Sequence, residues 1–157
     1  MGASANFQYN DIAFSMSADG GSTWSDPIRV NQTPLNIPPL NRQAFLPAIA
    51  VAANGTIGVS YYDFRFNDAN PGVPTDYWLV QCRPSSTATP ANAANWGNEL
   101  RLTGSSFNLE ACPLRLGVYC LGDYFGLAAA GSGLVATFTQ PDPNNNISTI
   151  FASRIGP

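Results

Sequence analysis

One segment pattern occurs twice in this chain at a fixed spacing. The segment WSDPIRVN (24–31) aligns with WGNELRLT (96–103), Trp with Trp and Arg with Arg, at an offset of 72 residues. The same offset separates Leu79 from Phe151, which lie in two other short apolar segments. Self-similarity at a fixed period indicates repeated structural units, each too small to bury its apolar face alone.

Four types of strand-like segment, named A to D in chain order, account for the repeats. Type A comprises 46–52 and 124–130; type B, 57–65 and 134–142; type C, 11–17, 76–82 and 148–154; type D, 24–31 and 96–103. The short linkers ANGT and GSG between A and B are typical of hairpin turns. No segment sustains a helical period, so the chain is predicted to be all-β.

A four-stranded antiparallel unit repeated in tandem predicts the blades of a β-propeller. The small residues of AIAVAA and GLAAAG suit an inner strand beside a central axis. We expect a single partial propeller domain over 1–157, with blade 1 as strands C–D (11–31), blade 2 complete (45–103) and blade 3 as strands A–C (123–155). Such a set is an incomplete ring, since a closed propeller needs roughly four to eight blades. The alternative is a two-sheet sandwich of about nine strands.

The segment SADGGSTW (17–24) connects a C-type to a D-type segment. It resembles the Asp box of sialidase-like (BNR-repeat) β-propellers, Ser-x-Asp-x-Gly-x-x-Trp, with Ser17, Asp19, Gly21 and Trp24 at the motif positions. An Asp side chain in such a turn accepts hydrogen bonds from backbone N–H groups, and Gly adopts a positive φ. We expect Trp24 to fold under the turn as an apolar plug, with its indole N–H on a carbonyl. In the family these boxes lie away from the ligand face, which implies a structural role.

The resemblance extends along most of the chain through the repeats. LGDYFGLAAAGSGLVATFTQ and IFASRI also look like late blades of bacterial sialidase-like proteins. The resemblance implies the chemistry of that family. In it, three Arg clamp a substrate carboxylate, an Asp acts as acid/base and a Tyr activated by Glu is the nucleophile. The chain departs from the pattern, because it has no Arg-Ile-Pro segment and the second unit has RPSSTATPANAAN in place of an Asp box.

The long connections between strands B and C and between strands D and A emerge on one face of a blade, and function concentrates on long loops over a rigid scaffold. They are 31–43, 65–75, 104–122 and 141–146. By residue type, the catalytic candidates there are Tyr124, Glu110 and Asp63. The ligand-binding candidates are Arg42, Arg65, Arg115, Asp68 and Asp123. The alternative for each is structural, for example an ion pair of Asp63 with Arg65.

Composition excludes several classes of function. The chain has seven basic and ten acidic residues, no His, and a formal charge of −3, so it lacks the basic patch of a nucleic-acid-binding protein. A Ser–His–Asp triad and a His zinc site are excluded. No apolar segment is long enough to cross a bilayer, and MGASANFQYN has no signal-peptide features, so a secreted or extracytoplasmic location is expected for a longer parent protein. No cofactor is expected, with the oxygen-rich PDPNNN (141–146) as a candidate calcium loop.

The three cysteines leave two alternatives open. A disulfide between Cys112 and Cys120 would close a short ring around PLRLGVY and stabilise the fold by about 2–3 kcal/mol. Cys82 lies in a strand-like segment and is expected to be a buried thiol. Otherwise all three are free thiols in a reducing compartment.

We therefore expect a sialidase-like propeller module that recognises a glycan or glycoconjugate, with glycoside hydrolysis only in a completed ring. The alternative is a non-enzymatic assembly or protein-interaction module. Because unpaired sheet edges pair with other strands, the expected partner is a second copy of the chain or the remainder of a longer propeller, and neither nucleic acid nor a membrane.

Overall fold

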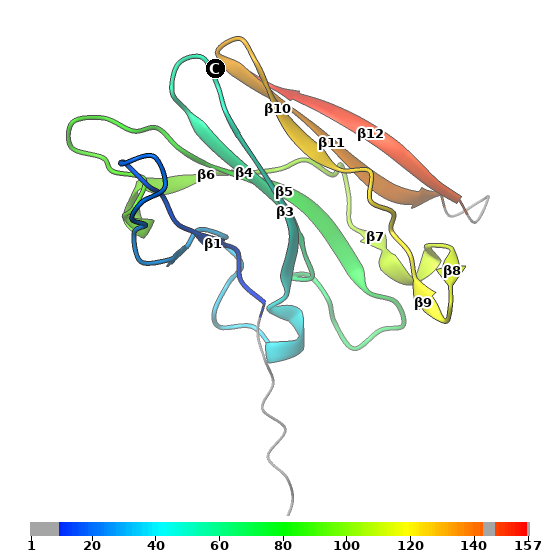
Figure 1. Cartoon of the computed structure of the whole chain (residues 1–157). Helices are drawn as coiled ribbons and strands as arrows, with labels where there is room; N and C mark the ends of the chain where they lie inside the picture. Colours follow the sequence, from blue (N-terminus) through cyan, green and yellow to red (C-terminus); the bar gives the residue numbers. More distant parts are fainter. Residues whose placement is uncertain (1–9, 143–146, 157) are drawn as a thin grey trace, which may run out of the picture.

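The computed structural model describes residues 10–142 and 147–156. In these residues the chain forms β-strands and three single-turn 3-10 helices, η1 (Pro39–Asn41), η2 (Ala93–Asn95) and η3 (Leu109–Ala111) (Figure 1). Neighbouring strands within the sheets are antiparallel, so the prediction of an all-β chain with antiparallel sheets is confirmed. Among the described residues no helix has the length and apolarity needed to cross a membrane.

The central sheet contains four strands that follow one another in the chain. They are β3 (Ala44–Val51), β4 (Ile57–Asp63), β5 (Pro74–Cys82) and β6 (Trp96–Arg101). A short strand, β7 (Phe107–Asn108), pairs with the beginning of β5. Strand β5 is buried on both faces over 75–80, because other parts of the chain pack against each face of the sheet.

The C-terminal sheet is a three-stranded meander. Its strands are β10 (Gly126–Ala130), β11 (Gly133–Asp142) and β12 (Ile147–Ile155), in that order. Strand β10 lies against β3 and β4 of the central sheet (Figure 1). Strand β12 is exposed over most of its length. Because consecutive residues 149–152 are exposed and side chains alternate along a strand, both of its faces are exposed there.

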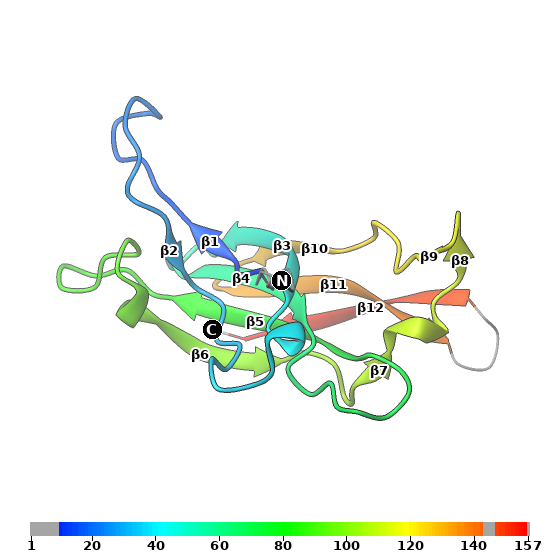
Figure 2. The same ribbon diagram turned by 90° about the horizontal axis from the view of Figure 1, so that it is seen from below.

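Two hairpins complete the described part of the chain. Strands β1 (Ala13–Phe14) and β2 (Ile28–Arg29) form the first, and its turn projects away from the rest of the molecule (Figure 2). This pairing is shorter than expected. Beyond it, the Ser25 N–H donates to the Met16 carbonyl at 2.8 Å, and Ser25 Oγ accepts from the Met16 N–H at 3.2 Å. Strands β8 (Leu114–Arg115) and β9 (Val118–Tyr119) form the second hairpin, in a segment that was expected to be a loop.

The first hairpin and the central sheet have the same strand register. Phe14 lies opposite Ile28 in the hairpin, and Leu79 lies opposite Leu100 in the central sheet. These are the residues that the sequence alignment places at equivalent positions. The similarity at 72 residues therefore corresponds to a repeated strand pairing.

Two apolar cores lie on opposite faces of the central sheet. Because side chains alternate along a strand, Tyr77 and Leu79 of β5 pack with β11, whereas Trp78 and Val80 pack with the first hairpin. The Tyr62 hydroxyl crosses the first of these cores and donates to the main-chain oxygen of residue 139 at 3.1 Å. The central sheet is thus the middle layer of three.

Candidate functional site

Equivalent Asp–Arg pairs join neighbouring strands in the first two repeat units. In the hairpin, Arg29 Nε lies 2.7 Å from Asp11 Oδ1, and in the central sheet Arg101 Nε lies 2.7 Å from Asp76 Oδ1. Each Asp precedes the aligned Phe14 or Leu79 by three residues. The equivalent position before Phe151 in the third unit is a serine. These acidic and basic side chains therefore close the end of a strand pair, a structural role.

The second pair is the more buried of the two. The Asp76 carboxylate also accepts from Thr103 Oγ1 at 2.5 Å and from Ser106 Oγ at 2.8 Å, and its side chain is 1% exposed. The Asp11 and Arg29 side chains are 33% and 30% exposed. Burial in the low-dielectric interior makes removal of one partner far more costly at the second pair.

A larger polar network lies where β4 ends. Arg65 Nε donates to Asp63 Oδ2 at 2.7 Å, and Arg65 NH1 lies 2.6 Å from Glu99 Oε2. The guanidinium carbon lies 3.7 Å from the centroid of the Trp78 ring, a cation–π contact. The Tyr61 hydroxyl donates to Glu99. The network thus places a Tyr–Glu pair beside an arginine.

Burial governs the ionisation of this network. Burial raises the pKa of Asp63 above its usual value, and the nearby Arg65 charge opposes that rise only in part. Burial, followed by the charge of Glu99, raises the pKa of Tyr61 well above its ordinary value. Tyr61 is 0% exposed, so its hydroxyl stays protonated and out of reach of a substrate. The pair ties strands together and does not form an accessible nucleophile.

The first two repeat units meet at this network. Thr33, in the connection that follows β2, donates to Asp63 Oδ2 at 2.6 Å, and the N–H of Gln32 donates to the Tyr61 hydroxyl at 2.9 Å. Sequence analysis missed Glu99, which is 38 residues from Tyr61. The contact follows from the strand pairing, since Trp78 lies opposite both Tyr61 and Arg101, and Glu99 is two residues from Arg101 on β6.

The other candidate residues lie apart from this network. Asp68 is exposed and accepts from the Asn70 N–H at 2.8 Å, and Arg42 ends η1 half-buried. Glu110 is exposed in η3, and Asp123 is exposed. The side chain of Arg115 lies outside the described part of the structure.

The three catalytic candidates are not brought together. Among the described residues, no hydrogen bond or ion pair joins Tyr124, Glu110 and Asp63. Asp63 is fully buried, whereas Tyr124 is 68% exposed. The alternative that Asp63 and Arg65 form a structural ion pair agrees with the geometry.

Tyr124 lines a shallow pocket at the end of the C-terminal sheet. The pocket measures about 390 Å³ and is formed by Pro113, Cys120, Gly122, Tyr124, Thr139, Ile147, Ser148 and Ile150. Thr139 Oγ1 donates to the main-chain oxygen of Tyr124 at 2.9 Å, which fixes the backbone beneath the ring. The pocket therefore presents one exposed aromatic ring with hydroxyl and apolar side chains around it.

The segment 17–24 forms a turn centred on the Asp19 carboxylate. Asp19 Oδ1 accepts from the Thr23 N–H at 2.9 Å, and Oδ2 accepts from the Thr23 hydroxyl at 2.6 Å. These hydrogen bonds lower the pKa of Asp19 to about 2, with the Thr23 hydroxyl as the largest cause. Ser17 Oγ accepts from the Gly21 N–H at 2.8 Å, and Gly21 has a φ of 94°.

Trp24 differs from the expectation of a buried plug. Its Nε1 donates to the Gly21 carbonyl at 3.2 Å, as expected, but its side chain is 66% exposed. The aligned Trp96 donates to the Pro90 carbonyl at 2.8 Å and is only 4% exposed, packed against Phe14. The turn of this hairpin projects away from the sheets (Figure 2), in keeping with the exposure of Trp24.

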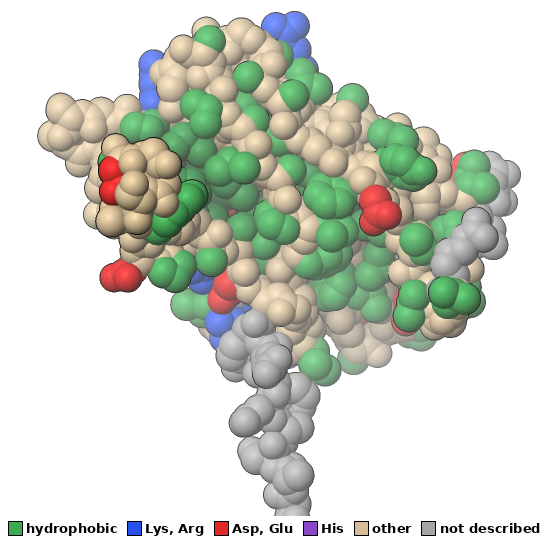
Figure 3. Space-filling view, viewed as in Figure 1, with side chains coloured by type: hydrophobic (Ala, Val, Ile, Leu, Met, Phe, Trp, Pro, Cys, Tyr) green, Lys and Arg blue, Asp and Glu red, His purple; other side chains and the backbone are tan. Residues whose placement is uncertain are grey.

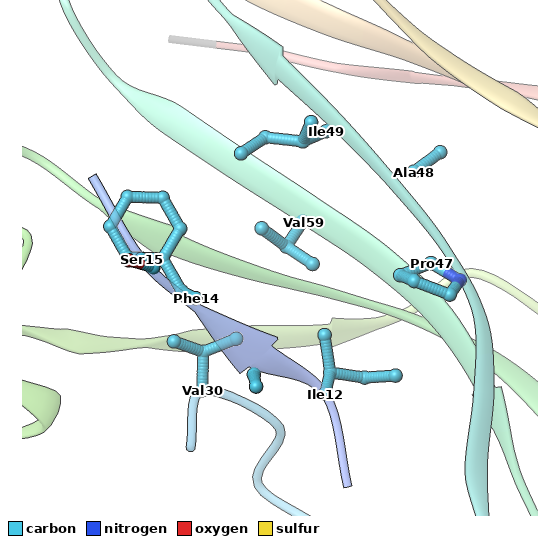
Figure 4. A pocket seen from close by; sticks show the side chains of 9 residues that line it. Ile12, Phe14, Ser15, Val30, Pro47, Ala48, Ile49 and Val59 are labelled. Carbon is cyan, nitrogen blue, oxygen red and sulfur yellow. The ribbon is translucent and has the colours of Figure 1, made fainter. Parts of the chain in front are cut away.

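An apolar groove separates the first hairpin from the central sheet (Figure 4). It measures about 230 Å³ and is lined by Ile12, Ala13, Phe14, Ser15, Val30, Pro47, Ala48, Ile49 and Val59. The labelled side chains of β1, β3 and β4 face one another across it (Figure 4). Its lining has no charged side chain, which suits an apolar occupant.

Of the two alternatives for the cysteines, the structure has the one without a disulfide. Cys82, Cys112 and Cys120 are all free thiols. Cys112 is buried in the core beside Tyr62, whereas Cys120 is exposed. Both lie at the open end of the β8–β9 hairpin, where the Cys120 N–H donates to the Pro113 carbonyl at 2.9 Å. Cys82 is buried, as expected. The candidate calcium loop lies largely outside the described residues, which omit 143–146.

Comparisons of this chain with protein-family models, with curated proteins and with solved structures find no match.

Proposed function

We propose that this chain is an assembly and protein-interaction module built from sialidase-like propeller sheets, and that copies of it associate through their open strand faces. One observation carries the proposal: large apolar side chains are exposed on regular strands. Ile49 and Val51 of β3 are 55% and 56% exposed, and Ile150 and Phe151 of β12 are 56% and 42% exposed. Exposed apolar surface of this kind marks interaction sites on soluble proteins.

The distribution of charge supports the same interpretation. Apolar side chains are spread over the face seen in Figure 3, with few acidic or basic side chains among them. Much of the charge that the chain has is instead placed in the Asp–Arg pairs and the Arg65 network. A surface low in charge opposes association weakly, because little like-charge repulsion or desolvation has to be overcome.

The repeated register supports the propeller part of the proposal. A hairpin and a four-stranded meander share one pairing register and one Asp–Arg pair, as expected of successive blades. The small residues of β10 lie against β3, which suits inner strands that approach one another closely. The buried state of Tyr61 and the separation of Tyr124 from Asp63 argue against hydrolysis by this chain alone.

Size-exclusion chromatography with light scattering tests the proposal. We expect the apparent mass to rise with protein concentration and to fall to that of one chain in Phe151→Arg. The matched control is Leu116→Arg, at a fully exposed apolar residue in the β8–β9 turn, which should associate like the parent chain. A single-chain mass at every concentration, or an equal loss in both variants, would refute it.

Glycan recognition is a second candidate, and the exposed Tyr124 ring favours it. The apolar face of a sugar ring packs on an exposed aromatic side chain, while hydroxyl groups nearby satisfy its polar edge. The pocket supplies such a hydroxyl from Ser148, whereas the buried Thr139 hydroxyl already donates to the Tyr124 carbonyl. On an array of sialylated and neutral glycans, Tyr124→Ala should lose binding and Tyr124→Phe should keep it. Binding that survives Tyr124→Ala would exclude this pocket, and a fluorogenic sialoside should not be hydrolysed.

A further inference from the structure

The apolar groove of Figure 4 runs beside an open strand edge. The Val30 N–H donates to the Ile12 carbonyl at 3.0 Å, so the even-numbered residues of β1 direct their backbone groups toward β2. Backbone groups alternate in direction along an antiparallel strand. The N–H and C=O groups of Ala13 and Ser15 therefore point away from β2, and both residues line the groove. Among the described residues these groups have no strand partner.

The contact between the central and C-terminal sheets, here called the second seam, shows how a space equivalent to the groove is filled. The first seam is the contact between the first hairpin and the central sheet. By the repeat, β5 corresponds to β1, and Leu127 of β10 corresponds to Ile49 of β3. Next to β5 lies β4, paired antiparallel, and β10 packs against it. A Cβ added at Gly58 of β4 would lie 3.3 Å from Leu127 Cδ2 and closer still to Leu134 Cδ1. The glycine thus makes room for leucine side chains.

Within residues 10–142 and 147–156, no strand takes the place of β4 between the first hairpin and the central sheet. Ile49 is 55% exposed there, whereas Leu127 packs against the core of the second seam. An added β-strand requires an open backbone edge and an apolar surface beside it. The edge supplies main-chain hydrogen bonds for affinity, and the apolar surface selects the side chains.

We infer that this groove binds an extended peptide strand, which pairs antiparallel with Ala13–Ser15 and places a glycine over Ile49. The inference rests on the proposed function, because it names the partner of one open face of the module. The occupant is a strand of the β4 kind, with alternating apolar residues and a small residue at the position of Gly58. The repeat specifies this chemistry, because the groove is equivalent to the space that β4 fills between β5 and β10.

A peptide with the sequence of residues 55–64, GTIGVSYYDF, is the probe, and the same peptide with Gly58→Val is its control. Titration calorimetry on the full chain should show binding of the first peptide. The dissociation constant of the second should be at least about tenfold higher, because the added side chain overpacks the site. Amide exchange followed by NMR should slow at Ala13 and Ser15 when the peptide is bound. Equal affinity for the two peptides, or unchanged exchange, overturns the inference.

Two variants of β3 locate the site. Ile49→Arg should abolish peptide binding, whereas Val51→Arg should retain it, since Val51 is equally exposed on the same strand face but outside the groove lining. Circular dichroism of both variants verifies that they are folded. Equal loss in both overturns the inference.

The outcome separates this inference from the proposed function. If the chain self-associates but binds no peptide, the groove assignment alone fails. If it neither self-associates nor binds peptide, both fail. If Ile49→Arg abolishes self-association and no peptide binds, a second copy is the occupant and the peptide-strand inference is overturned.

Discussion

The first hairpin and the central sheet contain the same strand pairing in two different surroundings. Both have an apolar residue opposite an apolar residue, an Asp–Arg pair at one end and an aligned tryptophan four residues before the apolar residue of the second strand. In the hairpin Trp24 is 66% exposed, and in the central sheet Trp96 is 4% exposed. The comparison teaches that register and turn geometry are local properties, whereas burial depends on which other strands are present.

Replacement of the two tryptophans should separate these contributions most strongly. Trp96→Ala should lower the free energy of unfolding by about 3–5 kcal/mol, because it leaves a large cavity in the core. Trp24→Ala should change it by about 0.5 kcal/mol, as is usual for an exposed side chain. Urea denaturation of both variants measures the difference. Similar losses would mean that Trp24 is covered in solution, as self-association would predict.

The two Asp–Arg pairs provide the next largest contrast. Asp76→Ala should cost about 3 kcal/mol, since it leaves Arg101 and two hydroxyl groups without their buried partner. Asp11→Ala should cost less than about 1 kcal/mol, because that pair is a third exposed and screened by solvent. Thermal unfolding of each variant against the parent chain measures both. Equal midpoints would show that burial does not distinguish the pairs.

Two glycines of the central sheet sharpen the comparison at the seam. Gly58→Ala should cost about 1–3 kcal/mol, because its Cβ would collide with leucine side chains of the C-terminal sheet. Gly97→Ala should lie within about 1 kcal/mol of the parent chain, since its Cβ would meet nothing within 4 Å. Denaturant midpoints compare the two. A neutral Gly58→Ala would contradict the close packing of the sheets.

The smallest effect concerns the turn that only the first unit has. The pKa of Asp19 is about 2, below its usual 3.8, so its ionised form stabilises the turn above pH 3.8. This stabilisation is lost as the pH falls through about 2. The Thr23 amide resonance should titrate with that midpoint, and Asp19→Asn should abolish the titration. A midpoint near 3.8 in the parent chain would mean that the carboxylate bonds are not formed.

Several features of the fold could be predicted from local sequence. The spacing of Trp24 and Trp96 predicted two related strand units, and the structure pairs their aligned residues in one register. The turn at Asp19 was predictable as well, since its hydrogen bonds join residues at most four apart. The all-β class followed from the strand-like segments and the hairpin linkers.

The site could be predicted only in part, because its contacts join distant residues. The ion pair of Asp63 with Arg65 spans two residues and was among the alternatives, whereas the link from Tyr61 to Glu99 spans 38. Tyr124 was selected by residue type, yet it lies apart from the buried network. The burial of Cys112 beside Tyr62 is likewise a contact between residues far apart in sequence, which the cysteine spacing does not contain.

The sequence by itself determined the strand pairs, their register and the turn at Asp19, because these depend on hydrogen bonds and side-chain alternation over short distances. Only the tertiary structure decided that β5 is buried on both faces while Trp24, Ile49 and β12 remain exposed. The physical reason is that burial is a property of packed layers, so segments with the same strand pairing are buried to different extents when their neighbours differ.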